Sequence, residues 1–133
     1  MSVDKPFFDT NVLLYLFCGH DGDKAEKAEA LLAAKGVVSV QVLNEFASAA
    51  SRKFKMLWPE VREALATIRA SCEVIPLTVE IHESGLAIAE RYGFSIYDSQ
   101  ILAAAVHAKC RTVYTEDMQS GQVVQDVTIR NPF

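Results

Sequence analysis

Four acidic residues spread along the chain could together form a site for a divalent cation. They are Asp9, Glu45, Asp98 and Asp117. Asp9 and Asp117 follow apolar runs that are typical of buried strands. Glu45 lies on the mostly apolar face of a predicted helix, and Asp98 lies near the start of another. Two carboxylates ~4 Å apart repel each other by roughly 4 kcal/mol at an effective dielectric constant near 20, so four that converge need protonation or a cation. Oxygen ligands without a nearby His or Cys favour Mg²⁺ or Mn²⁺.

Each of these residues also has an ordinary structural explanation. Asp9 could be the N-cap of the helix that follows it, and Asp98 stands three residues after Ser95, which is the spacing of a capping box. Asp117 could be a turn residue, and Glu45 could lie at the edge of its apolar stripe and reach water. For each residue alone both explanations stay open. Their common location near strand ends and a helix start favours a shared site.

The elements that must position these residues alternate between strands and helices. Short apolar runs predict strands at Pro6–Phe8, Val37–Ser39, Glu73–Leu77, Thr112–Tyr114 and Val127–Ile129. A first helix is predicted to begin near Asn11, and three more span Asp23–Lys35 (ending at Gly36), Val40–Phe54 and Pro59–Ser71. Two further helices are predicted, one capped by Thr78 that runs to Tyr92 and ends at Gly93, and one capped by Ser95 that runs to about Lys109. Pro76 marks the third strand as an edge strand.

This alternation predicts an α/β domain with a central parallel sheet of about five strands flanked by helices. The length of 133 residues fits one domain over positions 1–133, and a hydrophobic content of 50% excludes a disordered chain. In open parallel sheets, functional sites lie beyond the carboxyl ends of the strands. The four acidic residues can all face that edge.

Charge and cysteine content limit the classes of function. The net charge of −4 excludes a protein that is basic throughout, so any nucleic-acid contact must be local. The densest basic group is Arg52, Lys53 and Lys55, at the end of the helix that bears Glu45. It could contact phosphates or be a solvated helix end.

Three widely spaced cysteines, no recognisable signal peptide and no apolar stretch of about 20 residues lead us to expect a cytoplasmic protein outside the membrane.

Several motifs, in this order and strand context, resemble the PIN-domain family over essentially the whole chain. They are Asp9-Thr10-Asn11, Leu43-Asn44-Glu45-Phe46, Tyr97-Asp98 and Thr115-Glu116-Asp117, with an ending from Glu116-Asp117-Met118 to Asn131-Pro132-Phe133 that is similar to a bacterial branch. The resemblance implies a single PIN-like domain with Mg²⁺- or Mn²⁺-dependent endoribonuclease activity. Small members of this kind are often VapC-like toxins, so it also implies an RNA substrate, an antitoxin partner and a homodimer.

The resemblance also carries roles over to individual residues. The catalytic carboxylates would be Asp9, Glu45, Asp98 and Asp117, of which Asp9, Asp98 and Asp117 would hold the metal. Thr10 or Asn11, together with Thr115, would orient carboxylates or water. The family pattern assigns no role to Glu116.

Two other classes of function stay open at this point. Asp9 could be the nucleophile of an aspartyl-phosphate phosphatase, although Asn11 replaces the second Asp that such enzymes require and no Lys is obviously placed to hold the phosphoryl group. The domain could instead bind RNA or a protein without catalysis, its acidic residues serving only as caps. The apolar segment Met56-Leu57-Trp58 is expected in the core, with antitoxin docking as the alternative.

Overall fold

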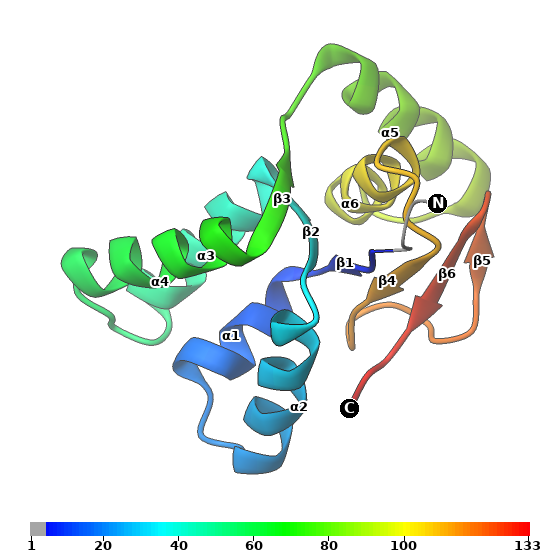
Figure 1. The fold of residues 1–133 in the computed structure, drawn as a ribbon. Helices are drawn as coiled ribbons and strands as arrows, with labels where there is room; N and C mark the ends of the chain where they lie inside the picture. The colour runs from blue at the N-terminus through cyan, green and yellow to red at the C-terminus, as the bar shows by residue number, and fades with distance from the viewer. Residues whose placement is uncertain (1–4) are drawn as a thin grey trace.

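Six strands form one sheet at the centre of the molecule (Figure 1). The computed structural model describes residues 5–133, so Met1–Asp4, on which the expectation of no signal peptide mainly depends, lie outside the described residues. The strands are β1 (Phe7–Phe8), β2 (Gly36–Ser39), β3 (Cys72–Ile75), β4 (Thr112–Tyr114), β5 (Val123–Val124) and β6 (Val127–Arg130). Their order is β3-β2-β1-β4-β6-β5, with all pairs parallel except β5–β6. The predicted α/β sheet is confirmed, with β3 at an edge and β5 as an additional short strand.

Six helices connect these strands. They are α1 (Thr10–Cys18), α2 (Gly22–Ala33), α3 (Val40–Arg52), α4 (Trp58–Ser71), α5 (Val79–Tyr92) and α6 (Ile96–His107). Side chains cap α1, α3, α5 and α6 at their N-termini, where they accept hydrogen bonds from the otherwise unpaired N–H groups; the caps are Asp9, Ser39, Thr78 and Ser95. Gly93 ends α5 with φ 79°, as predicted.

The predicted role of Gly36 as the residue that ends α2 was wrong. Lys35 has the left-handed conformation there, with φ 65°, and Gly36 is the first residue of β2. A Cβ atom at Gly36 would lie 2.5 Å from the Phe8 ring and 2.6 Å from the Pro6 carbonyl oxygen. Glycine is therefore required by the close approach of β1 to β2 rather than by the turn.

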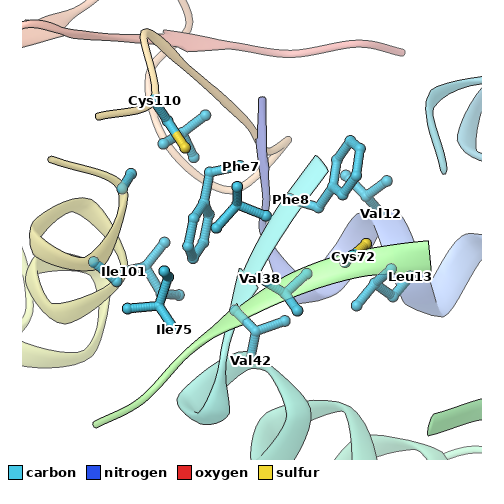
Figure 2. Packing of buried hydrophobic residues seen from close by; sticks show 14 of the residues in the cluster. Phe7, Phe8, Val12, Leu13, Val38, Val42, Cys72, Ile75, Ile101 and Cys110 are labelled. Atoms are coloured by element: carbon cyan, nitrogen blue, oxygen red, sulfur yellow. The ribbon is translucent and has the colours of Figure 1, made fainter. Parts of the chain in front are cut away.

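The core lies on both faces of the sheet. Phe7 and Phe8 are consecutive in β1 and both are 0% exposed. Figure 2 shows Phe7 directed toward Ile101 of α6 and Phe8 directed toward Val12 of α1. In Figure 1, α5 and α6 lie on one side of the sheet, α1 and α2 lie on the other, and α3 and α4 lie beside β2 and β3. Burial on both faces explains why the strand sequences are continuously apolar.

The strand order reverses direction at the centre of the sheet. From β1 the chain adds β2 and then β3 on one side, and it returns through α5 and α6 to β4 on the other side of β1. The carboxyl ends of β1 and β4 therefore flank a topological switch point, where open α/β sheets form their ligand sites. Among residues 5–133, none of the helices combines the length and apolar character that crossing a bilayer requires.

Candidate active site

Asp9 occupies the carboxyl end of β1 and is only 4% exposed. Its Oδ1 accepts a hydrogen bond of 2.7 Å from the Thr10 backbone N–H, which makes it the N-cap of α1. Its Oδ2 accepts a second bond of 2.8 Å from Thr115 Oγ1, at the end of β4. Asp9 is therefore a cap and, through its other oxygen, part of a cluster that joins the two central strands.

Asn11 and Thr115 connect Asp9 to Asp117. Asn11 Nδ2 donates to Thr115 Oγ1 and to Asp117 Oδ2, both at 3.0 Å. Thr115 Oγ1 also accepts from the Asp117 backbone N–H at 3.1 Å. The predicted orienting residues thus contact the carboxylates they were expected to orient. Because the Asn11 amide occupies the position at which a phosphatase needs a second carboxylate, the structure adds no support to that alternative.

Glu45 enters the same region from α3 and is half-buried. Its Oε2 accepts a 2.7 Å hydrogen bond from Thr10 Oγ1, and its Oε1 accepts a 3.3 Å bond from Gln41 Nε2. Gln41 Nε2 also donates to the Tyr97 backbone carbonyl at 2.9 Å, in the first turn of α6. Sequence analysis missed Gln41, although it lies four residues before Glu45 and therefore on the same helix face.

Asp98 lies half-buried in the first turn of α6, where its backbone N–H donates to Ser95 Oγ at 3.1 Å. Its carboxylate interacts electrostatically with those of Asp117 and Glu45. Burial raises the pKa of Asp98, and the negative charges of Asp117 and Glu45 raise it further.

The pKa of Asp9 is raised by the same two causes. Burial raises its pKa to about 7, against the hydrogen bonds from Thr115 and Thr10, and the charges of Glu45 and Asp117 add to the increase. The structure therefore brings all four predicted acidic residues into one electrostatically coupled cluster, which we call the acidic cluster.

The donor chemistry of the acidic cluster fits a hard divalent cation, because every side chain in it offers oxygen atoms and the negative charge lacks a cationic partner within it. Within residues 5–133, no three His, Cys, Asp or Glu side chains are already drawn together as a ready-made ligand set.

Glu116 is held outside the acidic cluster. Its carboxylate forms a 3.1 Å ion pair with Lys24 Nζ of α2 and accepts a hydrogen bond from the Tyr15 hydroxyl of α1. Lys24 Nζ also donates to Tyr15 Oη at 3.0 Å and lies 4.6 Å from the centre of the Tyr15 ring. We call these three side chains the Glu116 anchor. They give Glu116 a structural role in tying the segment after β4 to α1 and α2.

The basic residues at the end of α3 lie close to the acidic cluster. Arg52, Lys53 and Lys55 are exposed and line a hollow of about 850 Å³ that extends along α3 to Glu45. Lys53 also lines a second hollow of about 430 Å³, whose wall includes Asp117. The basic group thus borders one hollow that reaches Glu45, and Lys53 alone of the three borders the second, which reaches Asp117.

The expectation that Met56-Leu57-Trp58 lies in the core was wrong for two of its three residues. Leu57 and Trp58 are 68% and 61% exposed, whereas Met56 is half-buried. The reason is that Leu57 and Trp58 form the cap and first turn of α4, from which they project into solvent.

Comparisons with known proteins agree with this architecture. A toxin–antitoxin complex from Klebsiella pneumoniae has a TM-score of 0.73 and 23% identity over 96% of this chain and 98% of that chain. The Mycobacterium tuberculosis toxin VapC20, which cleaves the sarcin–ricin loop, has a TM-score of 0.69 and 20% identity over 84% and 91% of the two chains. VapBC2 from Rickettsia felis, bound to a DNA fragment from its promoter, has a TM-score of 0.68 and 17% identity over 95% and 97%.

At these identities the likeness shows the fold alone, and a comparison with curated protein sequences gives no match. The family comparison is more decisive, because the model of the PIN domain matches residues 7–123, which include all four carboxylates of the acidic cluster. The chain therefore belongs to the PIN domain family.

Proposed function

We propose that this protein is a Mg²⁺- or Mn²⁺-dependent endoribonuclease that hydrolyses phosphodiester bonds of RNA. The catalytic carboxylates are Asp9, Glu45, Asp98 and Asp117, of which Asp9, Asp98 and Asp117 hold the metal. The observation that carries this proposal is the convergence of four carboxylates from separate segments at the switch point between β1 and β4, where burial and mutual repulsion raise the pKa of Asp9 and Asp98. Membership of the PIN domain family supports it.

Each contact in the acidic cluster then has a task in the reaction. Thr115 and Asn11 fix the directions of the Asp9 and Asp117 carboxylates through bonds of 2.8 and 3.0 Å. Thr10 and Gln41 hold the two oxygens of Glu45, which serves as a further ligand or positions the attacking water. The bound cation supplies a Lewis acid that lowers the pKa of water and neutralises charge on the phosphate.

The hollow along α3 provides a path for the RNA backbone. It runs from Glu45 to Arg52, Lys53 and Lys55, so a strand with phosphates on the basic group reaches the acidic cluster. Phosphate contacts release condensed counterions, which makes binding weaken steeply as salt concentration rises. Replacing the three basic residues by Gln should flatten this salt dependence, and an unchanged slope would mean that they form only a solvated helix end.

The direct test is cleavage of a set of RNAs with Mg²⁺ or Mn²⁺ and with EDTA. We expect cleavage that requires the metal and is lost in Asp98→Asn, whereas Asp126→Asn, at the exposed turn between β5 and β6, retains it. Cleavage that survives both EDTA and Asp98→Asn would overturn the proposal.

Metal binding can be measured separately, by thermal unfolding with increasing Mg²⁺ or Mn²⁺. A specific site gains about 3 kcal/mol of unfolding free energy at a hundredfold excess over its dissociation constant. Asp98→Asn should lose this gain and Asp126→Asn should keep it. A non-catalytic domain whose acidic residues act only as caps would show no metal-dependent gain.

We further propose that the protein is a cytoplasmic, homodimeric toxin that is neutralised by an antitoxin. Similar solved structures are toxin–antitoxin assemblies, and the exposed Leu57 and Trp58 offer an apolar surface for an antitoxin segment. Co-expression with the product of an adjacent small reading frame should suppress cleavage. In isolation, light scattering should give about twice the monomer mass of 14.7 kDa.

A further inference from the structure

A second hollow opens beside the acidic cluster. It has a volume of about 430 Å³ and is formed by α1, the segment that joins α1 to α2, the end of α3 and the segment after β4. Asp117 and Asn11 belong both to its wall and to the acidic cluster. Anything bound in it therefore lies next to the proposed reaction centre.

The apolar part of this wall suits a flat aromatic ligand. It consists of the rings of Tyr15 and Phe54 together with Leu14. Lys53 Nζ lies 5.5 Å from the centre of the Phe54 ring, at the border with the basic hollow along α3. The wall thus joins aromatic surface, on which a base can stack, to a cation that can meet a phosphate.

We propose that this hollow binds one unstacked nucleobase of the RNA substrate, next to the bond that is cleaved. The inference rests on the proposed ribonuclease function and adds a base-binding subsite to it. A volume of about 430 Å³ is within the range of small-ligand pockets and accommodates a nucleobase with its ribose. The backbone then follows the basic hollow, and Lys53 contacts the phosphate at the point where the two hollows meet.

The subsite has two consequences for the substrate. A base that leaves its stack must be unpaired, so the enzyme requires single-stranded or loop RNA at this position. Two polar side chains of the wall are already engaged within the protein, Asn11 with Thr115 and Asp117, and Glu116 with Lys24 and Tyr15. Stacking on the aromatic rings then favours purines moderately over pyrimidines.

The test uses RNA binding by the Asp98→Asn protein, which is expected not to cleave RNA and has one negative charge fewer beside the hollow. Single-stranded oligonucleotides carry one abasic residue, moved along the sequence from one oligonucleotide to the next. We expect one position at which loss of the base weakens binding by about tenfold, because a base–aromatic stack contributes roughly that much. Adding Phe54→Leu should remove the dependence on the base at that position and leave the other positions unchanged.

Two variants control this experiment. Phe94→Leu replaces another half-buried aromatic residue, outside the hollow, and should preserve the abasic effect. Phe54→Trp keeps an aromatic ring and should also preserve it, which guards against a general loss of structure in Phe54→Leu.

The outcomes separate this inference from the proposed function. RNA binding with no position-specific coupling to Phe54 would overturn the subsite and leave the ribonuclease proposal intact. A Phe54→Leu change that weakens binding of a protein partner but not of RNA would also overturn it. The absence of RNA binding by this variant, together with the absence of RNA cleavage by the native protein in Mg²⁺ or Mn²⁺, would overturn both.

Discussion

Glu116 and Asp117 are neighbours in the sequence but differ in how their negative charges are compensated. Glu116 forms an ion pair with Lys24 and accepts a hydrogen bond from Tyr15, so its charge is neutralised by the protein itself. Asp117 accepts a hydrogen bond from the neutral amide of Asn11, and its charge raises the pKa values of Asp9 and Asp98. An acidic residue with its own cation stabilises the fold, whereas a cluster without one has capacity for a cation from outside.

The strongest test of this difference is to neutralise Asp117 and Glu116 one at a time. Asp117→Asn should lower kcat/KM for RNA by roughly 10³-fold, because it removes a proposed metal ligand. Glu116→Gln, the matched change one residue away, should lower it by only a few-fold. The measurement is single-turnover cleavage at saturating Mg²⁺. Equal losses in the two variants would mean that the structural distinction between the residues has no functional meaning.

A smaller effect is expected when an orienting group is removed. Thr115→Val deletes the hydroxyl that donates to Asp9 and accepts from Asn11 and from the Asp117 N–H. We expect a 10- to 100-fold loss of metal affinity, which is typical for residues that orient metal ligands. Isothermal titration with Mn²⁺ measures it directly. Thr112→Val, in β4 and outside the acidic cluster, is the control and should bind the metal as the native protein does.

Without metal, the uncompensated negative charge of the acidic cluster should also make the free energy of unfolding depend on pH. The pKa of Asp9 rises from 3.8 to about 7 on folding, so between these values the native state binds a proton that the unfolded state releases. The native protein therefore loses stability as pH rises through this window. Asp9→Asn removes this loss while an amide can still cap α1.

In EDTA, the variant and the native protein should be nearly equally stable below pH 4. Above pH 7 the variant should be more stable by on the order of 4 kcal/mol, because the pKa of Asp9 rises by about three units and each unit corresponds to about 1.4 kcal/mol. Chemical denaturation across this pH range measures which of the two proteins is the more stable at each pH. A native protein that is the more stable at pH 8 would show that Asp9 is well compensated even without metal.

The acidic cluster could be predicted from sequence because its members follow local signals. Asp9 and Asp117 come after apolar strands, Asp98 follows the capping residue Ser95, and parallel strands place their carboxyl ends at one edge. The Glu116 anchor could not be predicted in this way. Lys24 and Tyr15 are 92 and 101 residues from Glu116, and no local pattern indicates such pairs.

Strand β5 and the role of Gly36 are two of the features that sequence analysis missed or misplaced. Strand β5 has only two residues and pairs only with β6, so its sequence carries too short a pattern to recognise. Gly36 follows a helix, which favours a helix-ending role, but its requirement comes from contacts with Pro6 and Phe8 of a neighbouring strand. For Gly36 the deciding interaction is tertiary, whereas β5 is too short to show the periodicity by which a strand is recognised.

The smallest expected effect concerns the Glu116 anchor itself. Lys24→Met removes an ion pair whose side chains are 32% and 24% exposed, so the loss of unfolding free energy should be about 1 kcal/mol or less. The variant leaves Glu116 without its cation, one residue from Asp117. If the ion pair is what keeps Glu116 out of the proposed metal site, Lys24→Met should alter metal affinity more than Glu116→Gln, which removes the negative charge of the pair. Mn²⁺ titration of both variants decides this, because a purely structural ion pair predicts the same small change in each.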